Sequence, residues 1–71
     1  MEERRYILIR ANKYYIEEPE FFDTYYDAHE EMKRQYEVWS NGCIGELNDD
    51  NAWCLDNDCI TNWKIICVPI K

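Results

Sequence analysis

Residues 24–42, Thr-Tyr-Tyr-Asp-Ala-His-Glu-Glu-Met-Lys-Arg-Gln-Tyr-Glu-Val-Trp-Ser-Asn-Gly, carry the strongest structural signal in this chain of 71 residues. Thr24 with Asp27 three positions later has the pattern of a capping box, which is typical of a helix start. The apolar residues that follow recur every three or four positions, as in the buried stripe of an amphipathic helix. This stripe consists of Tyr25, Ala28, Met32, Tyr36 and Trp39. Asn41 and Gly42 predict the left-handed end of the helix.

The segments outside this helix predict strands. Residues 5–12, 51–55 and 62–68 are rich in β-branched and aromatic side chains. The turn residues Asp56-Asn57-Asp58 lie between the last two segments, which predicts an antiparallel hairpin with a loop longer than the tightest kind. The order is then β-α-β-β. A helix that covers one face of a small sheet makes a two-layer α+β domain.

Residues 1–71 are expected to form a single domain, because the chain is too short for two. Residues 13–22 and 43–50 lack a clear period and are expected to be loops. One face of the first strand holds the small apolar set Ile7, Ile9 and Ala11. This face is expected to point to the core.

Negative charge dominates the chain and is segregated along it. The net charge is −7, and twelve of the fifteen acidic residues fall in two stretches without Lys or Arg. The first stretch holds Glu17, Glu18, Glu20, Asp23, Asp27, Glu30 and Glu31, and the second holds Glu46, Asp49, Asp50, Asp56 and Asp58. A one-signed field of this kind attracts basic partners and repels nucleic acid and anionic membranes. The charge pattern therefore favours a binding protein that touches neither nucleic acid nor membrane.

The candidate partner-binding residues come from both acidic stretches and from the aromatic cluster beside the first. They are Glu46, Asp49, Asp50, Asp56, Asp58, Glu17, Glu18, Glu20, Tyr14 and Tyr15. The second stretch is favoured, because a hairpin loop held rigid binds at a lower entropic cost. In the alternative, both stretches only confer solubility, and Tyr14, Tyr15, Phe21 or Phe22 carries the binding. The net charge opposes self-association, so a monomer or weak dimer is expected.

The N-terminal segment does not predict export or membrane insertion. The apolar run at residues 6–9 is too short for a signal sequence or a membrane span. The chain is therefore expected in the cytoplasm. There its cysteines would stay reduced.

Four cysteines are a high density for an intracellular domain of this size, and they suggest one structural zinc ion. Cys54 and Cys59 bracket the expected hairpin turn, and Cys43 follows the helix, so three thiolates would meet at one place. The fourth ligand would be Cys67, His29 or an aspartate.

Side-chain parity argues against Cys67 as a zinc ligand. With residues 55 and 63 placed symmetrically about the turn, Cys67 lies on the sheet face opposite to Cys54. The face of Cys67 then also holds Trp53, Leu55, Trp63 and Ile65. Cys67 is therefore expected to be a small core residue. In the alternative to zinc, all four cysteines are mostly buried thiols that act as small hydrophobic side chains.

The residue types that usually carry catalysis do not form a recognisable set. His29 is the only histidine, and its place beside the helix stripe predicts a half-buried imidazole against the sheet. Ser40 is the only serine and has no base at a recognisable spacing. Adjacent carboxylates such as Asp49 and Asp50 are typical of a solvated surface. No enzyme activity is expected.

Three segments carry a resemblance to a known family. They are Tyr6-Ile7-Leu8-Ile9-Arg10-Ala11, then Phe22-Asp23-Thr24-Tyr25 leading into Asp27-Ala28-His29-Glu30-Glu31-Met32, and Asn62-Trp63-Lys64-Ile65. In this pattern the chain resembles small acidic proteins of Gram-positive bacteria, their phages and mobile elements. Among these it is most similar to the anti-CRISPR proteins that inactivate the RNA-guided nuclease of type II-A systems. The resemblance implies a nuclease partner, whose basic channels for guide and target would receive a compact acidic domain.

Two functions from different classes follow. The first is a non-enzymatic inhibitor that binds the basic surface of a host protein or ribonucleoprotein, such as a type II-A CRISPR nuclease. The second is a zinc-stabilised structural or regulatory interaction module with no link to defence.

Overall fold

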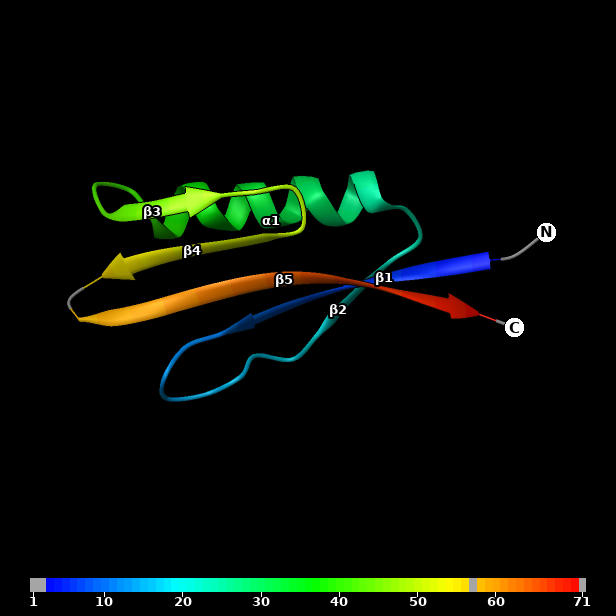
Figure 1. The fold of residues 1–71 in the computed structure, drawn as a ribbon, viewed down its shortest axis with the longest axis horizontal. Helices are drawn as coiled ribbons and strands as arrows, with labels where there is room; N and C mark the ends of the chain where they lie inside the picture. Colours follow the sequence, from blue (N-terminus) through cyan, green and yellow to red (C-terminus); the bar gives the residue numbers. More distant parts are fainter. Residues whose placement is uncertain (1–2, 57, 71) are drawn as a thin grey trace.

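The last strand of the chain lies at the centre of the sheet, and the other strands flank it on both sides (Figure 1). The computed structural model describes residues 3–56 and 58–70. In this range the elements are β1 (Glu3–Ala11), β2 (Glu20–Phe22), α1 (Tyr25–Trp39), β3 (Ile44–Leu47), β4 (Asn51–Asp56) and β5 (Cys59–Ile70). The strands form one antiparallel sheet in the order β2-β1-β5-β4-β3. With α1 packed on the sheet and a C-terminal hairpin present, the predicted two-layer α+β class is confirmed.

Two short edge strands, β2 and β3, occupy segments that the sequence predicts as loops. They are only three and four residues long and contain Glu or Gly, which are depleted in strands. A glycine is needed in β3 for a steric reason. A side chain at Gly45 would lie 2.6 Å from the carbonyl oxygen of Trp53 and 2.9 Å from the hydroxyl of Tyr36. Gly45 therefore lets β3 lie close to both β4 and the helix.

The two ends of α1 follow the predicted signals. Thr24 is the N-cap, and its hydroxyl accepts a hydrogen bond from the amide of Asp27 at 3.1 Å. At the other end, Gly42 adopts a φ of 78°, the left-handed conformation that glycine tolerates best. Within the described residues, no helix is long and apolar enough to cross a membrane.

The core lies between α1 and one face of the sheet. Its fully buried apolar members are Leu8, Ala28, Met32, Ala52, Cys54, Trp63 and Ile65. The expectation that Ile7, Ile9 and Ala11 face the core is wrong. Because β1 pairs Leu8 with Ile65 and Arg10 with Trp63, its even-numbered residues face the helix. Both faces of this strand are apolar, so alternation alone does not tell them apart.

The helix stripe is rotated relative to the prediction. Ala28 and Met32 are buried as expected, and Tyr36 packs against the core. Trp39, however, is 39% exposed, and the third buried position of the helix is the polar Gln35.

The β4–β5 hairpin has a register different from the expected one. Asp56 pairs with Cys59 and Cys54 pairs with Thr61, so only two residues connect the paired strands. Asp58 adopts a positive φ of 65° in this turn, while Asn57 lies outside the described residues. The shorter turn changes the parity of the pairing. Cys54 therefore shares the helix-facing side with Trp63, and the prediction that it lies on the face opposite to Cys67 is wrong.

Replacement of Met32 by alanine should lower the free energy of unfolding by about 2–5 kcal/mol, because the side chain is fully buried and leaves a cavity. Val38→Ala, on the same helix at 65% exposure, should change it by no more than about 0.5 kcal/mol. Urea denaturation followed by circular dichroism measures both values. Equal stabilities of the two variants would contradict the assigned helix face.

Candidate functional site

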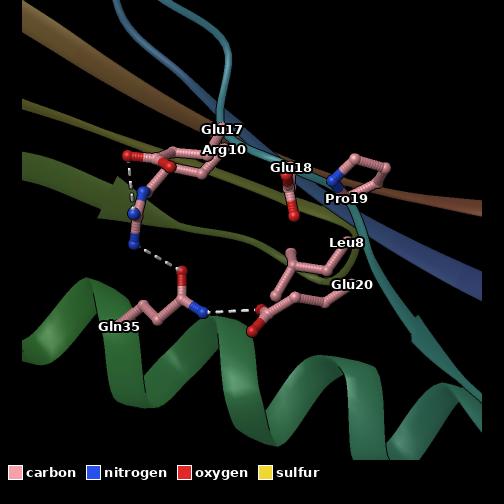
Figure 2. A pocket seen from close by; sticks show the side chains of 7 residues that line it. All are labelled: Leu8, Arg10, Glu17, Glu18, Pro19, Glu20 and Gln35. Carbon is pink, nitrogen blue, oxygen red and sulfur yellow. Dashed lines mark hydrogen bonds and ion pairs between the residues drawn. The ribbon is translucent and has the colours of Figure 1, made fainter.

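A buried amide, Gln35, lies at the centre of the most organised polar cluster in the described part of the chain (Figure 2). The side chain is 7% exposed. Its Oε1 accepts hydrogen bonds from the Arg10 guanidinium at 3.1 Å and from the Trp63 indole at 3.0 Å. Its Nε2 donates to Glu20 at 2.9 Å and to Glu31 at 2.8 Å. All four hydrogen-bonding positions of the amide are thus occupied.

Arg10 extends this cluster from β1 toward the β1–β2 loop. Its guanidinium forms an ion pair with Glu17 at 3.2 Å and lies 4.2 Å from the centroid of the Trp39 ring. The backbone amide of Glu17 also donates to the carbonyl of Arg10 at 2.9 Å. One cation therefore holds a loop carboxylate, the buried amide and a helix aromatic in fixed positions.

A groove of about 420 Å³ opens above this cluster. It is lined by Leu8, Arg10, Glu17, Glu18, Pro19, Glu20 and Gln35. Figure 2 shows Glu18 and Pro19 on the strand side of the groove and Gln35 rising from the helix. Three carboxylates and one cation border the groove, so its charge is negative.

A second hollow, of about 440 Å³, continues the negative surface along α1. It is lined by Phe22, Asp27, Glu30, Glu31, Lys33, Arg34 and Glu37. Glu20 from the groove and Glu31 from this hollow both accept from Gln35, so the two features adjoin. We call their seven carboxylates the acidic surface: Glu17, Glu18, Glu20, Asp27, Glu30, Glu31 and Glu37. With the three bases Arg10, Lys33 and Arg34, the lining carries a net charge of −4.

The carboxylates of the acidic surface differ in how much of their charge is compensated. Glu31 accepts two hydrogen bonds from Arg34, and this cation, with the Gln35 amide, lowers the pKa of Glu31 below its usual value although partial burial opposes the shift. Within the described residues, Glu18 and Glu30 have no ion pair or side-chain hydrogen bond. Their charge is available to a partner.

Six of the seven carboxylates of the first acidic stretch, all except Asp23, line these two hollows, and none of the second stretch does. Asp49 and Asp50 lie in the β3–β4 turn, where Asp50 pairs with Lys64 at 3.4 Å. The backbone of Asp56 and Asp58 lies at the opposite end of β4. Glu46 projects from β3 on the sheet face away from the helix, since it pairs with Trp53.

His29 links the helix to the β3–β4 turn. Its Nδ1 lies 3.1 Å from the carbonyl oxygen of Asp49, and the Tyr25 hydroxyl donates to the same oxygen. The two rings stack at 5.6 Å. Lost hydration, followed by the charges of Asp49 and Asp50, raises the pKa of Tyr25, which keeps its hydroxyl protonated as a donor. The contacts of His29 therefore hold the first turns of α1 against the β3–β4 turn.

The four cysteines lie outside disulfide bonds and occupy different environments. Cys54 is buried in the core, and Cys43 and Cys59 are partly buried. Cys67 is exposed, with its sulfur 3.6 Å from the guanidinium of Arg4, so the prediction that it is a core residue is wrong. In the part of the chain that the structure describes, no three His, Cys, Asp or Glu side chains form a group that could hold a metal ion.

The aromatic candidates Tyr14 and Tyr15 are exposed in the β1–β2 loop. The side-chain oxygen of Asn12 accepts hydrogen bonds from both of their backbone amides, at 2.8 and 3.1 Å. These hydrogen bonds fix the backbone that carries the two rings, close in sequence to Glu17.

The Gln35 cluster was not among the predicted site residues. The available signal was the position of Gln35, three residues after Met32 and seven after Ala28, where a polar side chain enters the buried stripe. Its partners come from β1, β2 and β5, and their meeting depends on strand pairing that the sequence does not show.

Gln35→Ala should lower the free energy of unfolding by about 1–3 kcal/mol, because it leaves the buried Trp63 indole N–H without its acceptor. Glu30→Ala, on the outer side of the same helix, is the control and should change it by no more than about 0.5 kcal/mol. Chemical denaturation followed by tryptophan fluorescence gives both values. A Gln35→Ala variant as stable as the control would show that the amide is dispensable.

The lowered pKa of Glu31 predicts a pH effect of defined sign. Because the folded pKa lies below the usual 4.5, the stabilisation is complete above that pH and is lost as the pH falls through the folded value. Arg34→Gln should therefore be less stable than the wild type at neutral pH, and the difference should shrink in acid. Lys33→Gln is the matched control. A difference that stays constant down to about pH 3 would contradict the Glu31–Arg34 assignment.

Comparison with known proteins gave no match: no family model fits the chain, and neither the curated proteins nor the solved structures contain a significant relative. The function proposed below is therefore inferred from the surfaces of this chain.

Proposed function

We propose that the protein is a non-enzymatic inhibitor that binds a basic surface of a nucleic-acid-handling host complex through its acidic surface. The observation that carries this proposal is the gathering of seven carboxylates around the Gln35 cluster, with a net charge of −4 in the lining of the two hollows. The lining of these two adjoining hollows accounts for −4 of the formal net charge of −7. Such a surface attracts basic partners over several ångströms and raises the rate of association.

The rigidity of this surface supports binding rather than mere solubility. Gln35, Arg10 and Arg34 hold Glu17, Glu20 and Glu31 by hydrogen bonds or ion pairs. When a partner binds, these carboxylates therefore lose less side-chain entropy than the carboxylates of a mobile acidic tail would lose. Glu18 and Glu30, beside them, supply uncompensated charge.

The chemistry of the acidic surface also favours binding over proton transfer. A general acid needs a carboxyl group with a raised pKa, whereas the pKa of Glu31 is lowered. An ionised carboxylate that already accepts from arginine is suited to further arginine and lysine side chains.

An RNA-guided nuclease of a type II-A CRISPR system is the partner we propose. Such a nuclease holds its guide–target duplex in a positively charged channel by backbone contacts, so a rigid array of carboxylates can compete for the same cations. This choice of partner rests on the resemblance to anti-CRISPR proteins, while the acidic surface supplies the physical means.

The test is DNA cleavage by a purified guide-loaded type II-A nuclease, with the protein added before the target. We expect inhibition by the wild type. Glu18→Lys/Glu30→Lys should weaken binding by about tenfold or more, because attraction becomes repulsion at two uncompensated sites. Binding should also weaken as salt rises from about 0.1 M to about 1 M, where the Debye length falls from about 10 to about 3 Å.

The control is Glu46→Lys/Asp49→Lys, which makes the same change of charge in the second acidic stretch. It should bind nearly as the wild type does, and both variants should keep the wild-type melting temperature. Failure of the wild type to inhibit would refute the nuclease as partner. Equal loss in both variants would show that total charge matters and the acidic surface does not.

A further inference from the structure

The face of the sheet opposite α1, which we call the open face, has no layer covering it among the described residues. The register defines this face. Ile7 pairs with Ile66 and Leu55 with Ile60, and these pairs alternate with the helix-facing pairs Leu8–Ile65 and Cys54–Thr61. In Figure 1, β3, β4 and β5 run alongside one another, while β1 and β5 cross in this view because the sheet is twisted.

The open face is apolar at both ends of the sheet. One cluster, on β2, β1 and β5, consists of Phe21, Ile7, Ile66 and Val68. The other, on β5, β4 and β3, consists of Ile60, Leu55, Trp53 and Ile44. Phe21 is 59% exposed and Ile44 is 70% exposed. Along β5, the polar residues Asn62 and Lys64 lie between Ile60 of one cluster and Ile66 of the other.

Charge is sparse on the open face compared with the rest of the molecule. By register, its strand positions carry Glu3, Arg5, Glu46 and Lys64, whose formal charges sum to zero in a chain of net charge −7. Lys64 is already paired with Asp50. Two copies can therefore meet on this side without bringing their acidic surfaces together, and the overall charge does not forbid self-association here.

The molecule is large enough in two dimensions for its open face to form a standard interface. The molecule measures 45 × 21 × 14 Å along its principal axes. The two longer dimensions enclose a rectangle of about 900 Å², which is an upper limit for the projected area of this face, and a standard protein interface buries about 800 Å² per partner. Exposed apolar patches of several hundred Å² on small proteins mark sites of association.

We propose that two copies of this chain pack open face to open face, with their sheets stacked and α1 of each copy outermost. A two-fold interface uses the same patch on both copies, and an apolar face with few charges is complementary to itself. Stacked sheets lie about 10 Å apart, close enough for the two sets of side chains to interdigitate. This arrangement specifies a dimer where the net charge predicts a monomer or weak dimer, and it leaves both acidic surfaces facing solvent.

Sedimentation equilibrium on the wild-type chain tests the proposal. We expect a mass twice that of the 8.7 kDa chain at about 100 µM, and little dependence on salt because the interface is apolar. Ile44→Lys/Ile66→Lys should weaken dimerisation by at least about tenfold, since it places two charges in the interface of each copy. A monomeric wild type at that concentration overturns the proposal, as does a dimer unaffected by the double substitution.

The matched control is Tyr26→Lys/Val38→Lys, which adds the same charge at residues 68% and 65% exposed on α1. It should remain a dimer, and dissociation of this variant would place the interface on the helix side instead. A second readout does not depend on variant folding. In methyl NMR of the wild type, dilution should shift Ile44 and Ile66 but not Val38, and the reverse pattern overturns the proposal. None of these measurements includes a nuclease, so they fail or succeed independently of the proposed function.

Discussion

The hydrogen-bonded amide of Gln35 is the constraint on which the layered structure depends. A polar group this deeply buried is tolerated only when its donors and acceptors are all paired, since an orphaned one costs about 1–3 kcal/mol. Pairing it requires the indole of β5, the guanidinium of β1 and a carboxylate of β2 to converge on one point of the helix. Helix rotation and strand placement are thereby fixed together, which a purely apolar contact would not achieve.

This single-sided construction divides the molecule into two surfaces of different chemistry. On the helix side, the buried amide of Gln35 donates hydrogen bonds to Glu20 and Glu31 at the edge of the core, and the other carboxylates of the acidic surface line the same two hollows. On the open side, no helix of the described residues covers the apolar side chains of the same strands. A protein with one acidic and one apolar side has two separate means of association, one screened by salt and one not.

The helix was predictable from sequence because its signals are local. Thr24 and Gly42 act through their own backbone, and Met32 and Ala28 recur at the helical period. The faces of β1 and β4 were not predictable, because apolar residues occupy both sides of these strands and a change of one residue in the turn inverts the parity. For the site, the acidic residues were visible, but their grouping depends on Arg10, Gln35 and Glu20, which are brought together by pairing between distant segments.

The position of β5 has a consequence for biosynthesis. This strand is synthesised after the other five described elements, yet it pairs with both β1 and β4 and joins the two halves of the sheet. Until it emerges, the nascent chain holds two unconnected hairpins and a helix whose core lacks Trp63 and Ile65. Isolated hairpins are marginally stable in water, so folding is expected to wait for translation of the strand to finish. A ribosome that stalls before codon 63 would hold an unfolded chain, open to proteases, rather than a partly folded domain.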